Sequence, residues 1–305
     1  MARRPKISLI GTGSVGSAIA LALHDKGYPV ASIINRSGQP AIALAKAVNC
    51  ERVSTNLNDL ATSTQVLLIA VSDDAIADVA NFLATNKRAR FKDMFVFHLS
   101  GVHTTELLEP LRKKGAVVAS IHPIQTFPKG QRISQLRSKL KGIAYGLEGS
   151  EDALKIARRI IDDLEGKAII IPKELKPLYH IACVFASNYM MVFVHTISEL
   201  AKRLGFGAIW TEVLGPLMTS SMANVVQQPI GNVLTGPIVR KDLETIERHL
   251  DTLGVSAPNL LPLYSVFGIE LARLAKSGGR LTDDDFSEIL GVFRTTLKQS
   301  PKSKR

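Results

Sequence analysis

The feature that most limits how this chain can fold is a short apolar strand that leads directly into three closely spaced glycines. Residues 7–16 have the sequence Ile-Ser-Leu-Ile-Gly-Thr-Gly-Ser-Val-Gly, and the apolar stretch behind them predicts a helix. In such a strand–turn–helix unit, the first glycine permits a tight turn, the second lets the backbone approach a diphosphate, and the third lets the helix pack on the sheet. The helix N-terminus offers free amides and a positive dipole end to that anion. The pattern predicts a dinucleotide-binding loop, rather than a glycine-rich turn of another α/β unit, with contacts at Gly11, Thr12, Gly13, Ser14, Val15 and Gly16.

The end of the second predicted strand favours a phosphorylated adenosine ribose. The strand over residues 30–34 is followed by Asn35, Arg36 and Ser37, where a site for NAD would place an acidic residue. A guanidinium beside a hydroxyl suits a dianionic phosphate, which a carboxylate would repel. We therefore expect NADP as the cofactor, with an ordinary surface arginine as the alternative explanation of Arg36.

The strongly positive formal charge comes mostly from the two ends of the chain. The 305 residues carry a formal charge of +11, and seven of these charges lie in the tails, so that 11 − 7 leaves +4 for residues 7–297; the seven are Arg3, Arg4, Lys6, Lys298, Lys302, Lys304 and Arg305. Solvated basic tails explain this distribution better than a nucleic-acid surface, because only five Tyr and one Trp are available to stack on bases. We expect no nucleic-acid partner.

Cysteine usage and hydropathy indicate a cytoplasmic protein. Cys50 and Cys183 lie far apart and match neither a metal-ligand nor a redox spacing, so we expect neither disulfides nor a metal. The N-terminus lacks the apolar core of a signal peptide, and no window of about 18 uninterrupted apolar residues is present. We expect no membrane partner.

The order of elements predicts an α/β protein with two domains. Apolar strand-like runs alternate with helical stretches up to residue 172, which is typical of a doubly wound, mostly parallel Rossmann sheet. The predicted strands cover 7–11, 29–34, 66–71, 94–99, 116–121, 143–148 and 168–171, and the helices between them cover 14–26, 40–48, 73–86, 104–114 and 151–164. Residues 127–140 lack a clear period and predict a mobile connection or lid. Residues 173–305 predict an all-helical domain, with helices over 176–204, 207–226, 239–253, 258–277 and 282–297 and a capping arrangement of Thr282 with Asp285.

A crevice between the two domains, at the carboxyl ends of the strands, is the expected site of chemistry. Small polar residues follow two central strands there, and we expect them near the ribose and nicotinamide: Val71, Ser72, Asp73, Ser100 and Gly101. Their alternative role is to cap the next helices. Three histidines lie at the same strand ends, namely His98, His103 and His122. Their spacing is not a recognised metal-ligand pattern, so we expect them to line the crevice rather than to bind a metal, with His122 as a substrate contact.

Polar residues interrupt the apolar helix that begins near Pro177. At about 100° per residue, Lys176, His180, Cys183 and Ser187 share one stripe, and Asn188 lies next to it. Polar groups in a buried helix must meet partners or a ligand. We expect His180 to transfer a proton, Asn188 to orient the substrate and Ser187 to contact it, the alternative being a hydrogen-bonded core histidine.

An arginine opens a later helix. In residues 234–242, Arg240 is either a contact for an anionic substrate or the partner of Asp242, and the short-range pair is favoured.

The chain resembles the bacterial Rossmann-like proteins that carry the domain of unknown function 2520, often described as NADP-dependent oxidoreductases. The likeness rests on residues 11–16, 98–101, 115–123, 179–189 and 234–242. That family resembles the 6-phosphogluconate dehydrogenase-like group, which includes pyrroline carboxylate reductase, and this resemblance implies a helical C-terminal domain that dimerises and completes the active site. Two departures are present: Lys241 replaces an expected glycine, and the group's catalytic Lys-x-x-x-Asn helix is not reproduced.

Together these features predict an NADP(H)-dependent oxidoreductase that acts on a small, anionic carbonyl, imine or hydroxy compound and forms a homodimer through the helical domain. Two alternatives stay open. One is a regulatory protein that senses NADP(H) without turnover, and the other is hydride exchange with a deazaflavin.

Overall fold

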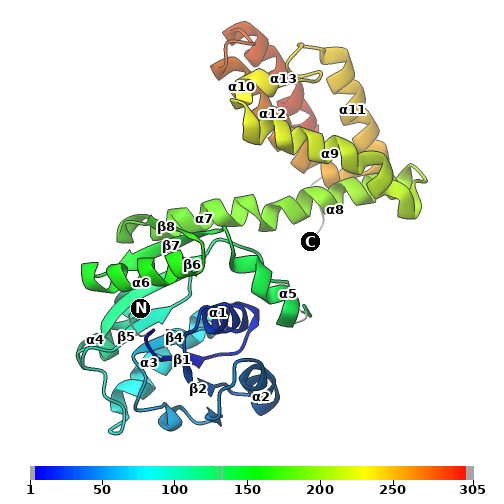
Figure 1. Ribbon diagram of the computed structural model, residues 1–305. Coiled ribbons are helices and arrows are strands. Elements are labelled where there is room, and N and C mark those ends of the chain that lie inside the picture. The colour runs from blue at the N-terminus through cyan, green and yellow to red at the C-terminus, as the bar shows by residue number, and fades with distance from the viewer. Residues whose placement is uncertain (1–3, 129, 132, 300–305) are drawn as a thin grey trace. The chain divides into compact units, whose positions relative to one another are not determined.

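The computed structural model describes residues 4–128, 130–131 and 133–299, and the chain forms two compact units, residues 1–190 and 191–305 (Figure 1). Of the basic tails, Arg3, Lys302, Lys304 and Arg305 lie outside the described residues. Arg4 is not simply solvated, because its guanidinium pairs with Asp163 and lies 5.3 Å from the centre of the Tyr28 ring.

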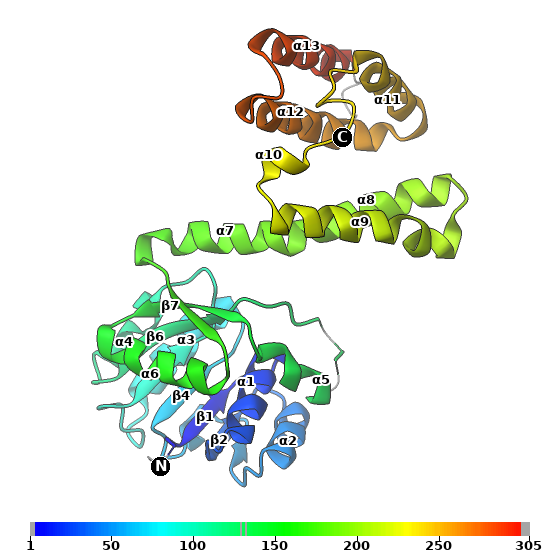
Figure 2. The same ribbon diagram turned by 45° about the horizontal axis from the view of Figure 1, so that its top comes forward.

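The first unit is built on an eight-stranded sheet with the order β3-β2-β1-β4-β5-β6-β7-β8. Figure 2 shows β2, β1, β4, β6 and β7 of this sheet. β1 to β6 are parallel, β7 runs antiparallel to β6, and β8 is parallel to β7. The strands are β1 (Ile7–Ile10), β2 (Val30–Ile34), β3 (Val53–Ser54), β4 (Val66–Ile69), β5 (Phe95–His98), β6 (Val117–Pro123), β7 (Ala144–Gly149) and β8 (Lys167–Ile170). The predicted mostly parallel Rossmann sheet is confirmed, and only the two-residue β3 was not predicted.

Helices cover both faces of this sheet, which is why its central strands are continuously apolar. One core joins the sheet to α1 (Ser14–Asp25), α2 (Gly38–Ala47), α5 (Ile133–Arg137) and α6 (Glu151–Asp163). The opposite core joins it to α3 (Ile76–Thr85) and α4 (Glu109–Arg112). All four residues of β1 and of β4 are buried.

The expected mobile lid is wrong for the part of residues 127–140 that carries α5. Leu136 and Leu140 are buried against α1, and Arg137 forms a 3.1 Å ion pair with Asp25. Leu136 lies in α5 and Leu140 in the 3₁₀ turn that follows it, and two such apolar anchors in adjoining short elements give the stretch no clear sequence period.

Two long helices follow β8. The predicted single helix over 176–204 is divided into α7 (Lys176–Ala186) and α8 (Asn188–Arg203) at Ser187, whose hydroxyl donates to the Cys183 carbonyl at 2.8 Å. An 18-residue window within Lys173–Arg203 has a mean hydropathy of 1.5, so this stretch is long and apolar enough to cross a membrane by length and composition alone, a test that core helices also pass. The expected burial of α7 is wrong for the chain by itself, because Ile181 and Phe185 are 51% and 62% exposed.

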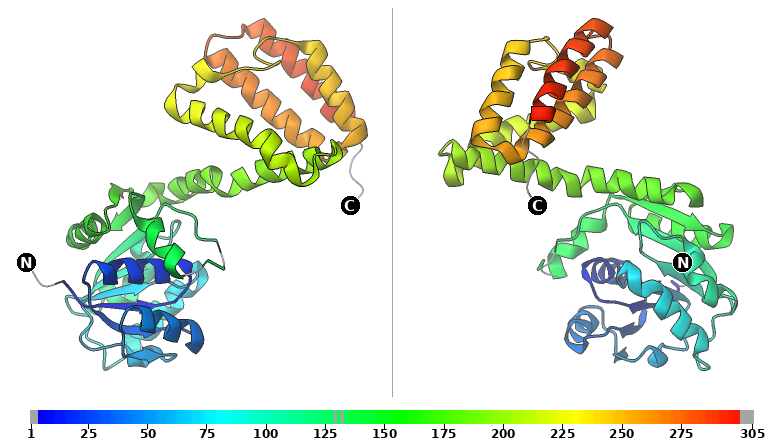
Figure 3. Two further views of the ribbon diagram at one scale, coloured as in Figure 1. Left: turned by 45° about the vertical axis from the view of Figure 1, so that its right-hand side comes forward. Right: turned by 180° about the vertical axis from the view of Figure 1, so that it is seen from behind.

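The second unit is helical (Figure 3). Most of α8 belongs to it, followed by α9 (Trp210–Gln227), α10 (Ile230–Val233), α11 (Leu243–Ser256), α12 (Leu261–Ser277) and α13 (Asp283–Gln299). Phe293 of α13 is fully buried, and its ring occupies the space where a side chain at Gly268 of α12 would lie. The predicted cap of α13 is confirmed, since the Asp285 amide donates to the Thr282 hydroxyl at 3.2 Å and the Asp285 carboxylate accepts from the Thr282 amide at 2.9 Å.

Candidate functional site

The three glycines of the first loop have different structural roles. Gly11 has φ +95°, and a β-carbon there would collide with the Ala70 carbonyl. A β-carbon at Gly16 would collide with the carbonyl of Gly11. At Gly13, which caps α1 with φ −65° and ψ 175°, a β-carbon would meet no atom within 4 Å. The chain's own packing therefore requires the first and third glycines, whereas Gly13 borders open space.

Polar groups around Gly13 fit an anionic ligand. The N-terminus of α1 has no side-chain cap, so its free amides are available. The Thr12 hydroxyl is buried without a hydrogen-bond partner, while the Thr12 amide donates to the Asn35 side-chain oxygen at 3.1 Å. Ser14 and Val15 are half-buried beside this opening. An orphaned hydroxyl, uncapped amides and an open Gly13 together match what the diphosphate of a dinucleotide needs.

The end of β2 presents an arginine to solvent. Asn35 is held in place by its bond to Thr12 and by a 2.8 Å bond from its side-chain nitrogen to the Ser37 carbonyl. Arg36 and Ser37 are exposed, and Arg36 forms no ion pair within the described part of the chain. The pKa of Asp74 is lowered, chiefly by the Ser72 hydroxyl and to a smaller extent by Arg36, so this guanidinium is within electrostatic reach of the end of β4.

The end of β5 is shaped by its own loop. The Ser100 hydroxyl accepts the Val102 and His103 amides at 3.3 and 3.1 Å, and the Ser100 carbonyl accepts from the Ser120 hydroxyl at 3.1 Å. Val71, Ser72 and Asp73 lie at the end of β4, and Ser72 precedes the 3₁₀ turn η2 (Asp73–Ala75) without capping it through its side chain. The side chain of Ser100 is thus already used by the backbone, whereas that of Ser72 is exposed.

Two imidazoles meet at Gly101. The rings of His122 on β6 and His180 on α7 lie 5.9 Å apart at 74°. A β-carbon at Gly101 would be 2.6 Å from His180 Nδ1 and 2.9 Å from His122 Nε2, so the glycine makes room for both rings. His180 Nδ1 is buried without a partner, although His180 as a whole is half-buried. Unpartnered buried nitrogens are rare and mark a place where a ligand or water is needed.

Tyr179 completes this group. Its hydroxyl lies 2.6 Å from His122 Nδ1, and the two rings are edge-on at 85°. Gly146 on β7, which is paired with His122, leaves the space for this hydroxyl, since a β-carbon there would lie 2.5 Å from it. Burial lowers the pKa of His122 to about 4, and the nearby charges of His180 and Lys176 act in the same direction.

A buried ammonium of α7 contacts the same two strands, β6 and β7. Lys176 is 1% exposed; its Nζ bonds the Ser120 hydroxyl and lies 3.9 Å from the Glu148 carboxylate. The Glu148 carboxylate also accepts the amide and hydroxyl of Thr105, both at 2.8 Å. Burial lowers the pKa of Lys176 to about 8, while Glu148 and then Asp73 act in the opposite direction.

Strand geometry explains why these groups gather. Ser120 and His122 are two residues apart on β6, so they point to the same face, and they pair with Glu148 and Gly146 on β7. Lys176 and His180 are four residues apart on α7 and share a helix face. The sequence prediction did not include Ser120, Glu148, Lys176 or Tyr179 as site residues. The spacing of Lys176 to His180 was the available signal.

His98 does not line the site, contrary to expectation. It is fully buried, its Nε2 bonds the Thr104 carbonyl at 3.1 Å, and its Nδ1 accepts the Ser100 amide at 3.2 Å. Burial lowers its pKa to about 3, so it is a neutral core residue that shapes the loop after β5.

The remaining predicted residues lie outside this cluster of contacts. Asn188 is exposed at the start of α8, and its side-chain oxygen accepts from the Ser187 hydroxyl at 2.9 Å. The favoured Arg240–Asp242 pair is wrong, because the Asp242 carboxylate caps α11 by accepting the amide and hydroxyl of Thr245 at 3.1 and 2.8 Å. Arg240 is exposed.

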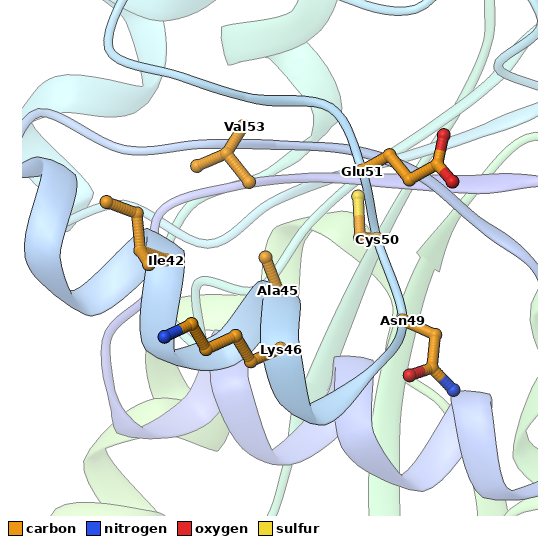
Figure 4. A pocket seen from close by; sticks show the side chains of 7 residues that line it. All are labelled: Ile42, Ala45, Lys46, Asn49, Cys50, Glu51 and Val53. Atoms are coloured by element: carbon orange, nitrogen blue, oxygen red, sulfur yellow. The ribbon is translucent and has the colours of Figure 1, made fainter.

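A shallow hollow of about 390 Å³ lies elsewhere on the first unit, between the end of α2 and the loop into β3 (Figure 4). Ile42, Lys46 and Cys50 are among its lining residues. Because α2 runs back from the carboxyl end of β2, this hollow is at the opposite edge of the sheet from Gly13 and His122.

Comparison with known proteins agrees with this architecture. A Rossmann-like domain model matches residues 1–123, and the model of the domain of unknown function DUF2520 matches residues 143–270. The chain carries both domains. The predicted resemblance is thereby confirmed, and no curated protein matches the chain.

Solved structures show the same fold. The candidate NADP oxidoreductase BF3122 from Bacteroides fragilis has a TM-score of 0.72 at 22% identity, over 89% of this chain and 99% of that one. Protein TM1727 from Thermotoga maritima has a TM-score of 0.68 at 26% identity, with 89% and 98% covered. A pyrroline-5-carboxylate reductase from Coxiella burnetii has a TM-score of 0.56 at 15% identity, with 96% and 98% covered.

Proposed function

We propose that this DUF2520 protein is an NADP(H)-dependent oxidoreductase that acts on a small, anionic carbonyl, imine or hydroxy compound. The observation that carries the proposal is that the open Gly13 loop and the His122–His180 pair both lie at the carboxyl ends of strands of one sheet. Ligands of doubly wound sheets bind at this edge. Proteins with a structure similar to that of this chain include ones named as NADP oxidoreductase and pyrroline-5-carboxylate reductase.

The cofactor would be held by the chain's own amides and by one guanidinium. The amides at the start of α1 and the Thr12 hydroxyl would bind the diphosphate, and Arg36 with Ser37 would bind the phosphate on the adenosine ribose. Val71, Ser72, Asp73, Ser100 and Gly101 would border the ribose and nicotinamide. When bound, a nicotinamide donates or accepts hydride, which no side chain can do.

The protein's side chains would manage the proton and the substrate's orientation. His180 would donate or accept the proton, since one ring nitrogen of a neutral imidazole carries a proton and the other can accept one. His122 would hydrogen-bond the substrate, and the buried Lys176 would add positive charge that favours an anionic ligand. Asn188, Ser187 and Arg240 keep their predicted roles as orienting and substrate contacts.

We also propose a homodimer in the cytoplasm. Leu178, Ile181 and Phe185 on α7 are 62%, 51% and 62% exposed in the single chain, and a second copy of the same helix would cover them. Both cysteines are free, as expected in a reducing compartment. Light scattering of the purified protein tests the dimer, and a monomer at micromolar concentration would contradict it.

Calorimetric titration with NADPH and NADH tests the function, with Gly13→Val as the decisive variant. A β-carbon at this position meets no protein atom within 4 Å and the backbone is not left-handed, so the fold should be unchanged while the valine side chain fills the space for the diphosphate. We expect saturable NADPH binding by the native chain and by the control Gly38→Ala, whose new methyl group also meets nothing. We expect no binding by Gly13→Val.

A screen of carbonyl and imine metabolites for loss of nicotinamide absorbance then tests turnover. Binding without turnover of any compound would favour the sensor over the enzyme, and oxidation only with a deazaflavin would favour that alternative. Folded native protein that binds neither nucleotide would refute the proposal.

A further inference from the structure

His122 is held by a hydrogen bond to Tyr179, and the groups around the two side chains determine which of them is the donor. The Tyr179 hydroxyl and His122 Nδ1 are 2.6 Å apart, so one of the two carries the shared proton. Burial raises the pKa of Tyr179, followed by the effect of the Cys183 thiol, and the hydroxyl therefore keeps its proton at working pH. A thiol sulfur is a weak acceptor, so the better acceptor for this hydroxyl is an unprotonated Nδ1.

The groups that face His122 disfavour a second proton on the ring. His180 and Lys176 face it from α7, and Asp73 faces it from the turn after β4. Asp73 is the only carboxylate among these groups, and it raises the pKa of His122 by less than burial, His180 or Lys176 each lower it, so the neutral ring is favoured. A neutral ring with an unprotonated Nδ1 must carry its single proton on Nε2.

That proton is directed to the site. The Cε1–Nε2 edge of His122 faces Gly101, where His180 Nδ1 also lies, and Nε2 has no hydrogen-bond partner among the residues with described positions. We propose that Tyr179 is a positioning residue that fixes His122 as the Nε2–H tautomer, so that His122 presents a neutral hydrogen-bond donor to the substrate. His180 is then the imidazole of the pair that is free to exchange a proton.

This assignment narrows the substrate class of the proposed oxidoreductase, and that part of the inference rests on the proposed function. A fixed N–H donor within the electrostatic influence of a buried ammonium selects a ligand atom that accepts hydrogen bonds, such as a carbonyl or carboxylate oxygen. A protonated amine has no lone pair to offer to this donor. The tautomer itself does not depend on any ligand.

Nitrogen NMR of the apo protein tests the tautomer directly. The chain has seven histidines, and Tyr179→Phe, His122→Gln and the native protein can be compared with ¹⁵N-labelled histidine, the second variant serving to assign the His122 signals. In the native protein we expect a proton on His122 Nε2 and none on Nδ1 from about pH 8 down to about pH 5. In Tyr179→Phe, we expect the Nδ1 resonance to shift and an Nδ1–H form to appear.

Tyr189→Phe is the matched control. Tyr189 is 48% exposed and its ring contacts Phe185, but its hydroxyl has no hydrogen bond among the described contacts. Its loss should leave the His122 signals unchanged. Should Tyr179→Phe fail to fold, Gly146→Ala offers a second route, because the new methyl group would press on the Tyr179 hydroxyl and displace it from Nδ1.

The outcomes separate the inference from the proposed function. If His122 of the native protein is protonated on Nδ1, or doubly protonated near neutral pH, the inferred tautomer is wrong. Unchanged His122 signals in Tyr179→Phe would overturn the role of Tyr179 in the same way. Failure to bind nucleotide would refute the proposed function while these spectra would still report the tautomer.

Discussion

The ammonium of Lys176 lies 3.9 Å from the carboxylate of Glu148, and both side chains are buried, at 2% and 7% exposure. The attraction is not sufficient to keep the lysine at its ordinary pKa, which burial lowers to about 8. This pair therefore links α7 to β7 through a cation that is costly to keep in the folded state.

Removal of the cation should destabilise the first unit. Lys176→Met leaves the Glu148 carboxylate buried with only its bonds to Thr105, and breaking a buried pair from one side costs about 3 kcal/mol or more. Chemical denaturation measures this loss, with Lys155→Met on the surface of α6 as a control that should change little. The double variant Lys176→Met/Glu148→Gln should lose less than the sum of the two single losses, and strict additivity would show that the pair is uncoupled.

The same lysine should make stability depend on alkaline pH. Because its folded pKa of about 8 is below its ordinary value, the unfolded chain binds more protons between about pH 8 and pH 10.5, and the contribution of Lys176 to stability rises with pH across this window. The gain is at most about 1.4 kcal/mol per pH unit. We expect the free energy of unfolding of the native protein to rise relative to Lys176→Met over this range. A constant difference between the two would contradict the lowered pKa.

A methyl group at Gly101 should disturb both imidazoles at once. The alanine β-carbon would lie 2.6 Å from His180 Nδ1 and 2.9 Å from His122 Nε2, so the rings must move apart. Overpacking of this kind costs about 1–3 kcal/mol. Gly38→Ala, where the methyl group meets nothing, should leave the unfolding midpoint nearly unchanged. Equal midpoints for Gly101→Ala and the native protein would show that the two rings are not tightly held.

Arg36 should determine the preference between the two nucleotides. Arg36→Gln would remove the proposed hydrogen bond to the ribose phosphate, and a hydrogen bond to a charged group is worth about 1.5–3 kcal/mol, which corresponds to a roughly 10- to 160-fold weaker affinity for NADPH. NADH, which lacks the extra phosphate, should bind the variant and the native protein equally well. Arg88→Gln, which removes another exposed arginine, is the control. A variant that retains its NADPH preference would exclude Arg36 as the phosphate contact.

Local sequence signals predicted the sheet and the loop because they depend on short-range chemistry. The apolar runs that form β1 and β4 are buried on both faces, and Gly11 adopts the left-handed backbone that the tight turn requires. β3 has only two residues and half-buried side chains, so it has no pattern to detect.

The candidate site was only partly predictable because it depends on long-range pairing. Glu148 and Ser120 lie opposite each other because β7 pairs with β6 in an antiparallel register. The sequence of either strand alone does not specify which strand it pairs with or in which register. The apolar side chains of α7 predict a buried helix, yet Ile181 and Phe185 are 51% and 62% exposed in the single chain, because apolar composition does not specify which surface a helix packs against. At Lys241, by contrast, the expected glycine has a physical reason, since this residue has φ +55°. Its ammonium lies 2.6 Å from both Asp285 and Glu288.

The unequal roles of the three loop glycines give a way to interpret relatives of this protein. Any descendant that keeps the fold must keep glycine at positions 11 and 16, whatever it has come to do, because the backbone around them leaves no alternative. At position 13 the surrounding atoms leave room for a β-carbon, so the fold does not require glycine there. A lineage that acquires a bulky side chain there while it preserves the other two would be one in which selection for nucleotide binding has ended but selection for the architecture has not.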